Sequence, residues 1–109
     1  MKTEKILSLL GFATKAGKLC FGFDMTSQAI KKKKCFLIVN ACDVSAKTLK
    51  EIDYKALESG IKRITLEGVD IKALSAAVGK SCGIISVNEK GFADACETAF
   101  NEGGNANDK

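Results

Sequence analysis

The stretch Cys35-Phe36-Leu37-Ile38-Val39-Asn40-Ala41 decides the fold of this 109-residue chain. Its first five residues are apolar at odd and even positions alike, which is typical of a strand covered on both faces. We therefore place residues 35–41 at the centre of a sheet, with helices packed above and below. On both sides of this strand, helical and strand patterns alternate along the chain. This alternation predicts an α/β fold, a three-layer α/β/α sandwich around a four-stranded mixed sheet.

Apolar spacing and capping residues define the neighbouring elements. The expected strands are residues 19–21, 35–41, 63–66 and 83–87. The expected helices are residues 3–15, 24–30, 46–59, 71–78 and 90–100. Asp24, Ser45 and Asp70 are the expected N-caps, and Gly60 and Gly79 are the expected left-handed helix ends.

Two further expectations concern burial and the end of the chain. In the second helix, Met25, Ala29 and Ile30 are expected to face the core. Residues 1–100 are expected to form one domain, and residues 101–109, with their two adjacent glycines, a disordered tail.

Composition excludes several classes of site. The chain has no histidine, which removes imidazole-based nucleophilic catalysis and imidazole metal ligands. Its five cysteines are odd in number, and no pair has the C-x-x-C spacing of a zinc site. No stretch resembles a signal peptide or a transmembrane helix, so we expect reduced, mostly buried thiols in a cytoplasmic protein. The sequence therefore predicts no enzyme, no cofactor, no metal and no membrane partner.

Positive charge is concentrated in the first half of the chain. Residues 1–50 contain ten lysines and three acidic residues, whereas residues 51–109 contain seven basic and ten acidic residues. The run Lys31-Lys32-Lys33-Lys34 lies between the second helix and the strand at residues 35–41. Such a density of cations suits a polyanion. A solvated corner that aids solubility is the open alternative for a lysine run taken alone.

Three other segments are candidates for binding. Gly22 lets the backbone approach a partner closely, and the amides of the helix start from Asp24 to Ser27 are placed to meet a phosphate. Asp24 itself is a candidate N-cap or an acceptor for a base N–H group. Ser45 follows the central strand, at the strand end where sites gather in open α/β sheets. Val78-Gly79-Lys80-Ser81 offers a glycine backbone, a cation and a hydroxyl in one loop.

The order of short motifs along the chain resembles one family. The motifs are Leu9-Leu10-Gly11, Lys15-Ala16-Gly17-Lys18-Leu19, Gly22, Ala29-Ile30-Lys31, Leu37-Ile38-Val39, Asp43, Ile61, Leu74, Val78-Gly79-Lys80 and Lys90-Gly91-Phe92-Ala93. Over residues 4–100 they are similar to the small bacterial YlxQ-like proteins. These belong to the superfamily of large-subunit ribosomal protein seven-Ae, the thirty-e protein and small-subunit protein twelve-e. The resemblance implies an α/β/α sandwich that binds kink-turn RNA, a bent helix with sheared G·A pairs.

The signature of this superfamily is Gly-x-Asn-Glu-x-Thr-Lys at the start of the second helix. Here the segment reads Gly22-Phe23-Asp24-Met25-Thr26-Ser27-Gln28. Gly22 is kept, and Ser27 keeps a hydroxyl. Asp24 lacks the amide donor of Asn, and Met25 lacks the carboxylate of Glu. Gln28 lacks the charge of Lys, so the segment departs from the family at the positions that read guanines.

The sequence thus predicts a monomeric, ribosome-associated RNA-binding protein that contacts structured RNA, of the kink-turn type, mainly through phosphates. The residues expected to make these contacts are Gly22, Asp24, Met25, Ser27, Gln28, Lys31, Lys32, Lys33, Lys34, Ser45, Val78, Gly79, Lys80 and Ser81. The alternative is a protein-interaction module that uses the same surface, because Phe23 and Met25 make it more apolar. Salt dependence separates the two, since phosphate contacts weaken steeply with salt. An RNA-modifying enzyme would need a cofactor motif, which the sequence lacks.

Overall fold

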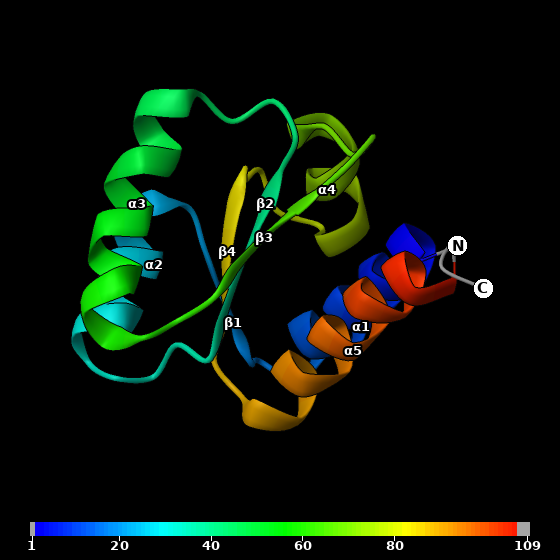
Figure 1. Cartoon of the computed structure of the whole chain (residues 1–109), viewed down its shortest axis with the longest axis horizontal. Helices are drawn as coiled ribbons and strands as arrows, with labels where there is room; N and C mark the ends of the chain where they lie inside the picture. Colours follow the sequence, from blue (N-terminus) through cyan, green and yellow to red (C-terminus); the bar gives the residue numbers. More distant parts are fainter. Residues whose placement is uncertain (1, 107–109) are drawn as a thin grey trace.

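The computed structural model describes residues 2–106 and confirms the alternation of helices and strands (Figure 1). The helices are α1 (Lys2–Lys15), α2 (Phe23–Lys31), α3 (Ala46–Ser59), α4 (Ile71–Val78) and α5 (Lys90–Ala106). The strands are β1 (Leu19–Phe21), β2 (Leu37–Ala41), β3 (Arg63–Leu66) and β4 (Ile84–Val87). The central strand begins at Leu37 rather than Cys35, and the last strand at Ile84 rather than Gly83.

The four strands form one mixed sheet in the order β1-β4-β2-β3. β4 pairs antiparallel with both β1 and β2, and β3 pairs parallel with β2. Every residue of β2 is buried, as its two-sided apolar pattern predicts. In this topology β1, β2 and β3 end at the same edge of the sheet, where β4 begins. We call this edge the carboxyl edge.

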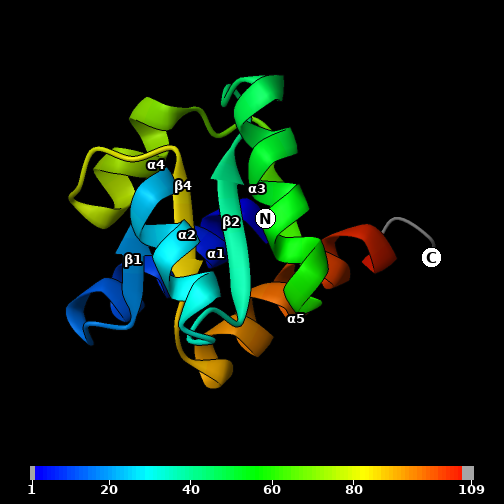
Figure 2. The ribbon, with the colours of Figure 1, turned by 90° about the vertical axis from the view of Figure 1, so that its left-hand side faces the viewer.

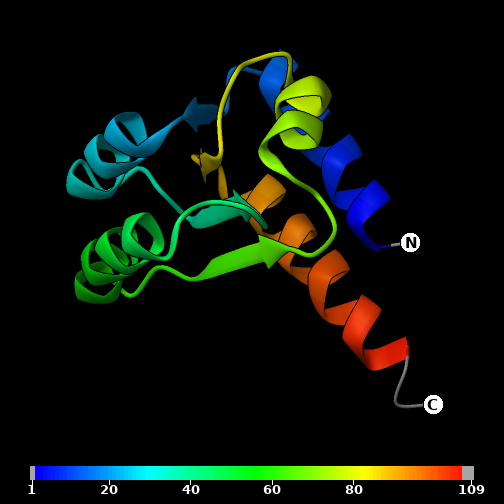
Figure 3. The same ribbon diagram turned by 90° about the horizontal axis from the view of Figure 1, so that it is seen from above.

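Helices cover both faces of the sheet. α2 and α3 lie on one face, and α1, α4 and α5 lie on the other (Figure 1, Figure 2). Leu37 and Val39 of β2 pack with the layer of three helices, whereas Ile38 packs with α2 and α3. α1 and α5 run side by side (Figure 3). The arrangement is the three-layer α/β/α sandwich that the sequence predicts.

A polar network holds α3 to the sheet. Asn40 of β2 is fully buried, and its Oδ1 accepts a hydrogen bond of 2.7 Å from the Arg63 guanidinium. Arg63 also donates to the Thr65 hydroxyl at 2.9 Å and to both carboxylate oxygens of Asp53 on α3. The hydrogen bonds from Arg63 lower the pKa of Asp53 below its ordinary value.

The last helix is longer than expected. The sequence predicts its end at Phe100, but α5 continues to Ala106. The chain contains no proline to interrupt the helix, and glycine weakens a helix without forbidding it. The segment predicted as a disordered tail therefore begins as helix. Residues 107–109 lie outside the described residues, and the division into a domain of residues 1–100 and a tail stays a prediction.

The long helices do not resemble membrane spans. Among the helices that the structure describes, none has the length and apolar content needed to cross a membrane.

Candidate nucleic-acid interface

The carboxyl edge brings together segments that are far apart in the sequence. The turn between β1 and α2, the loop between β2 and α3, and the loop between α4 and β4 all lie there. Gly22 N–H donates to Ile84 O at 2.7 Å, and Ala41 N–H donates to Gly83 O at 2.9 Å. These backbone bonds hold the β1–α2 turn, the β2–α3 loop and the α4–β4 loop together as one surface.

The start of α2 is open to an external hydrogen-bond acceptor. Gly22 is its N-cap residue, with φ 91° and ψ 166°, and none of the described side chains caps the helix there. The sequence predicts Asp24 as the cap, but the helix already begins at Phe23, so Asp24 is an exposed residue of the first turn. The first amides of α2 therefore keep the donors that a capping side chain would occupy. Gln28, near the middle of the helix, is exposed.

The buried face of α2 differs from the expected one. Thr26 is fully buried beside Ala29 and Ile30, whereas Met25, expected in the core, is 47% exposed. Helical spacing allows either residue, since Met25 precedes Ala29 by one turn and Thr26 precedes Ile30 by one turn. The hydroxyl oxygens of Thr26 and Ser27 are buried and have no hydrogen-bond partner among the described residues. The structure thus leaves Met25, and not Thr26, on the surface at the carboxyl edge.

The loop between α4 and β4 carries a cation to the same edge. Gly79 ends α4 with a left-handed φ of 76°, as the sequence predicts. Lys80 and Ser81 follow it and are exposed. The Lys80 Nζ lies 5.8 Å from the centre of the Phe21 ring, at the end of β1. The sequence predicts Val78 as an RNA contact, but Val78 belongs to the core and is only 5% exposed. Its side chain therefore does not take part in this surface.

Ser75, which is not among the residues predicted from the sequence, fixes the conformation of this loop. Its hydroxyl accepts a hydrogen bond of 2.9 Å from Cys82 N–H and donates one of 3.1 Å to Cys82 O. Both ends of the loop are thereby joined by a single side chain. Serine within a helix is common, so no pattern in the sequence points to this role.

Ser45 lies at the carboxyl edge, but its side chain caps α3. Ser45 Oγ accepts a hydrogen bond of 3.2 Å from Thr48 N–H and caps α3. Nearby, Asp43 Oδ1 accepts a hydrogen bond of 2.8 Å from Ile71 N–H at the start of α4. Both side chains therefore position the loops of the edge.

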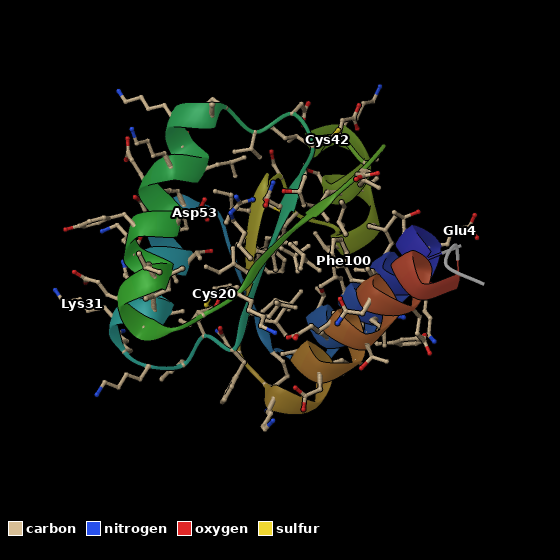
Figure 4. The ribbon with its side chains drawn as sticks, in the orientation of Figure 1. Glu4, Cys20, Lys31, Cys42, Asp53 and Phe100 are labelled. Carbon is tan, nitrogen blue, oxygen red and sulfur yellow. The ribbon has the colours of Figure 1, made fainter. Side chains whose placement is uncertain are left out.

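The lysine run lies away from the carboxyl edge. Lys31 to Lys34, which we call the lysine corner, begin at the last residue of α2 and continue past its C-terminal end, and all four are exposed. Because the run and the helix start are close in the sequence, we expect them to lie in one region. α2 instead runs back along the sheet, so its two ends lie at opposite edges (Figure 2). At 1.5 Å per residue, the two ends are about 12 Å apart. Figure 4 likewise shows Lys31 well away from Cys42, which follows β2 at the carboxyl edge.

Hydrogen bonds give the lysine corner a defined turn. Lys33 N–H donates to Ile30 O at 3.0 Å, and Lys34 N–H donates to Ala29 O at 2.9 Å. This pair of bonds is the Schellman motif, which places a left-handed residue after the helix. Lys33 occupies that position with φ 61°, and it is the one described non-glycine residue with positive φ. Glycine is preferred at this position, so the left-handed backbone conformation of Lys33 is energetically unfavourable.

The part of the chain that the structure describes offers neither a metal site nor reactive thiols among its buried cysteines. No group of three His, Cys, Asp or Glu side chains there is arranged to hold a metal ion. Burial raises the pKa of Cys35, and it raises the pKa of Cys96 to about 11. Burial also raises the pKa of Cys82, although its hydrogen bond with Ser75 opposes the rise. These thiols stay protonated at neutral pH and are poor nucleophiles.

Comparison with known proteins agrees with this fold. The sequence model of the ribosomal protein L7Ae/L30e/S12e/Gadd45 family matches residues 4–98. The chain belongs to this family. The large ribosomal subunit protein eL30 of Saccharomyces cerevisiae is 30% identical over 97 residues, which cover 87% of this chain and 91% of eL30. The eL30 of Candida glabrata is 30% identical over 93 residues, covering 84% and 88%.

Solved structures confirm the family fold. A protein of unknown function from Bacillus halodurans superposes with a TM-score of 0.83 at 26% identity, covering 89% of this chain and 97% of that one. A Giardia lamblia 15.5kD RNA binding protein superposes with a TM-score of 0.76 over 93% of this chain and 86% of that one. Its 12% identity supports the fold alone. The matched family and the two eL30 relatives are named as ribosomal proteins, in agreement with the expected non-catalytic chain. The YlxQ-like subtype stays a prediction.

Proposed function

We propose that this chain is an RNA-binding protein whose main contact surface is the carboxyl edge. The observation that carries the proposal is the meeting of two segments there. The uncapped start of α2 at Gly22 and the exposed loop with Lys80 lie on one surface, although they are far apart in the sequence. Membership of the ribosomal L7Ae family supports it, as does the name of the relative eL30.

Phosphates are the groups that this surface binds best. The free amides at the start of α2 and the positive end of the helix dipole attract an anion. Lys80 adds a full charge, and Ser81 adds a hydroxyl. Gly22 has no side chain, so the RNA backbone approaches the helix start closely. Phosphates are exposed in any RNA, but specific recognition mostly targets loops, bulges and ends, so structured RNA with a distorted backbone is the partner that we favour.

The lysine corner forms a second phosphate contact at the opposite edge of the sheet. It binds a segment of the same RNA that continues past α2. The left-handed Lys33 supports this role, because a turn built only to end a helix favours glycine. A non-glycine residue in this conformation costs roughly 1–2 kcal/mol.

Reading of guanines is the weakest part of the family function in this chain. Asp24, Met25 and Gln28 replace the Asn, Glu and Lys of the signature. We expect weak binding to a standard kink-turn, with little loss when its sheared G·A pairs are changed. The triple variant Asp24→Asn, Met25→Glu and Gln28→Lys should bind at least about ten-fold more tightly, on the order of 1–3 kcal/mol for regained base contacts. Tight and G·A-dependent binding by the unmodified protein would contradict this.

A protein-interaction module is the second candidate, and the exposure of Met25 favours it. Met25 presents a flexible apolar side chain, 47% exposed, at the carboxyl edge, and methionine is frequent at adaptable binding surfaces. Phe23, the other apolar residue considered for this role, packs against the buried cluster under α2 and α3. A protein partner would bind with little dependence on salt.

We place the protein in the cytoplasm, as a monomer that associates with ribosomes or their assembly. Ribosomal RNA is the structured RNA that this proposal favours, by analogy with eL30. Crosslinking the protein to RNA in cells and sequencing the bound fragments identifies the target.

The proposal is tested by titrating a kink-turn RNA at several salt concentrations. The log of the association constant should fall linearly with the log of salt concentration. Lys80→Gln should reduce the slope by about one unit for the phosphate it contacts. Lys90→Gln is the charge-matched control, since Lys90 is exposed on α5 and pairs with Asp94. An equal change in both variants, or no binding by the unmodified protein, would refute the proposal.

A further inference from the structure

An exposed phenylalanine marks a groove between α1 and α4. Phe12 is 62% exposed, although Ile6, Leu10 and Ala13 of the same helix are fully buried. Phe12 therefore lies off the face that packs against the core. Figure 3 shows the C-terminal half of α1 beside α4.

Small residues form the floor of this groove. Gly11 from α1 and Ala76, Ala77 and Gly79 from the end of α4 line it. Because these residues lack bulky side chains, an open groove of about 410 Å³ lies between the two helices. That volume is within the range of about 300–1,000 Å³ that is typical of small-molecule sites.

The side chains at the rim have the chemistry of a nucleotide site. The ring of Phe12 offers a flat apolar surface, and Lys15 offers an exposed cation. Thr14 Oγ donates a hydrogen bond of 2.8 Å to Leu10 O. The same oxygen can still accept a hydrogen bond from a ligand. None of the described residues that line the groove is acidic. Single-stranded nucleic acid is bound by this combination of an aromatic platform with nearby cations.

The groove is continuous with the carboxyl edge. Gly79 lines the groove, and the next residue, Lys80, belongs to the proposed phosphate site. We propose that the groove holds one unpaired nucleotide of the RNA, with its base on Phe12 and its phosphate near Lys15. This inference rests on the proposed RNA-binding function and adds α1 to the contact surface.

The test uses a hairpin RNA with a bulge of three uridines and the same hairpin without the bulge. Phe12→Ala should weaken binding to the bulged hairpin by about five-fold to a hundred-fold, as expected for loss of one stacked base. It should leave binding to the unbulged hairpin unchanged. Tyr54→Ala is the matched control, because Tyr54 is an aromatic residue of α3 with 71% exposure. Both side chains are exposed, so neither change empties the core.

A crosslink gives a second readout that does not depend on affinity. With 5-bromouridine in the bulge, ultraviolet light should join the RNA to the tryptic peptide of residues 6–15, which contains Phe12. If the protein binds the bulged hairpin with salt dependence, but Phe12→Ala behaves like Tyr54→Ala, this inference fails and the proposed function stands. If the unmodified protein binds neither RNA, both fail. Loss of a protein partner in Phe12→Ala without a change in RNA affinity would assign the groove to a protein and also overturn the inference.

Discussion

Gly22→Ala perturbs the start of α2 without touching any neighbouring side chain. A Cβ at this position would have no atom within 4 Å, so the change adds no clash. The φ of 91° and ψ of 166° nevertheless lie in a region that only glycine readily adopts, and we expect a cost in the upper half of about 1–3 kcal/mol. The helix start then either bears this strain or rotates away. In both cases the amides that meet phosphate are displaced or held at higher energy.

Gly60→Ala is the matched control for this change. Gly60 also has open space around a Cβ and a positive φ of 68°, but its ψ of 25° is ordinary left-handed helix, and it ends α3. We expect it to cost about 1–2 kcal/mol. Urea unfolding should show the larger loss for Gly22→Ala with an unchanged m value. At temperatures where both variants are folded, only Gly22→Ala should weaken RNA binding. Equal stability of Gly22→Ala and the unmodified protein, or equal loss of RNA affinity in the two variants, would refute the reasoning.

Three further predictions concern the acid pair, the thiols and the lysine corner. Because Arg63 lowers the pKa of Asp53 in the folded state, the pair stabilises the protein above the unfolded pKa of about 3.9 and loses this effect as pH falls through the folded pKa. In urea unfolding, Asp53→Asn should therefore lower the free energy of unfolding by up to about 1 kcal/mol at pH 7, since the carboxylate is half exposed. Near pH 2 the variant should lose almost nothing. An equally large loss at pH 2 would contradict the pairing. A thiol reagent, with labelling followed by mass spectrometry, should modify the exposed Cys42 in the native protein well before the buried cysteines. Equal labelling rates for all of them would contradict the packed core. Lys33→Gly should leave the free energy of unfolding unchanged or raise it by up to about 1 kcal/mol. It should also weaken RNA binding at low salt. Unchanged binding would show that the lysine corner only aids solubility.

The sheet and its helices were predictable because local patterns and the global fold agree. The two-sided apolar run at Leu37 to Val39 gave the central strand, and Ser45 and Gly79 marked helix ends that the structure confirms. Resemblance to the family added the expected function, which periodicity alone does not supply, whereas the strand order came only from the structure.

The candidate site was harder to predict because it depends on where the chain turns. The lysine corner and the start of α2 are neighbours in the sequence, but an intervening helix carries them to opposite edges of the sheet. Asp24 had the residue type of a cap, yet Gly22 takes the position with a φ of 91°, and its N–H group donates to Ile84 O. Phe12 has the residue type of a core side chain. Only the packing of α1 shows that it is exposed.

RNA binding at the carboxyl edge can be checked by mapping the backbone amides whose NMR signals move when kink-turn RNA is added to the labelled protein. We expect the largest changes in two segments of this edge, from Gly22 to Gln28 and from Gly79 to Ser81. We expect smaller, salt-sensitive changes at Lys31 to Lys34. Changes confined to the outer face of α3, around Tyr54, with none at the carboxyl edge would contradict RNA binding at this edge.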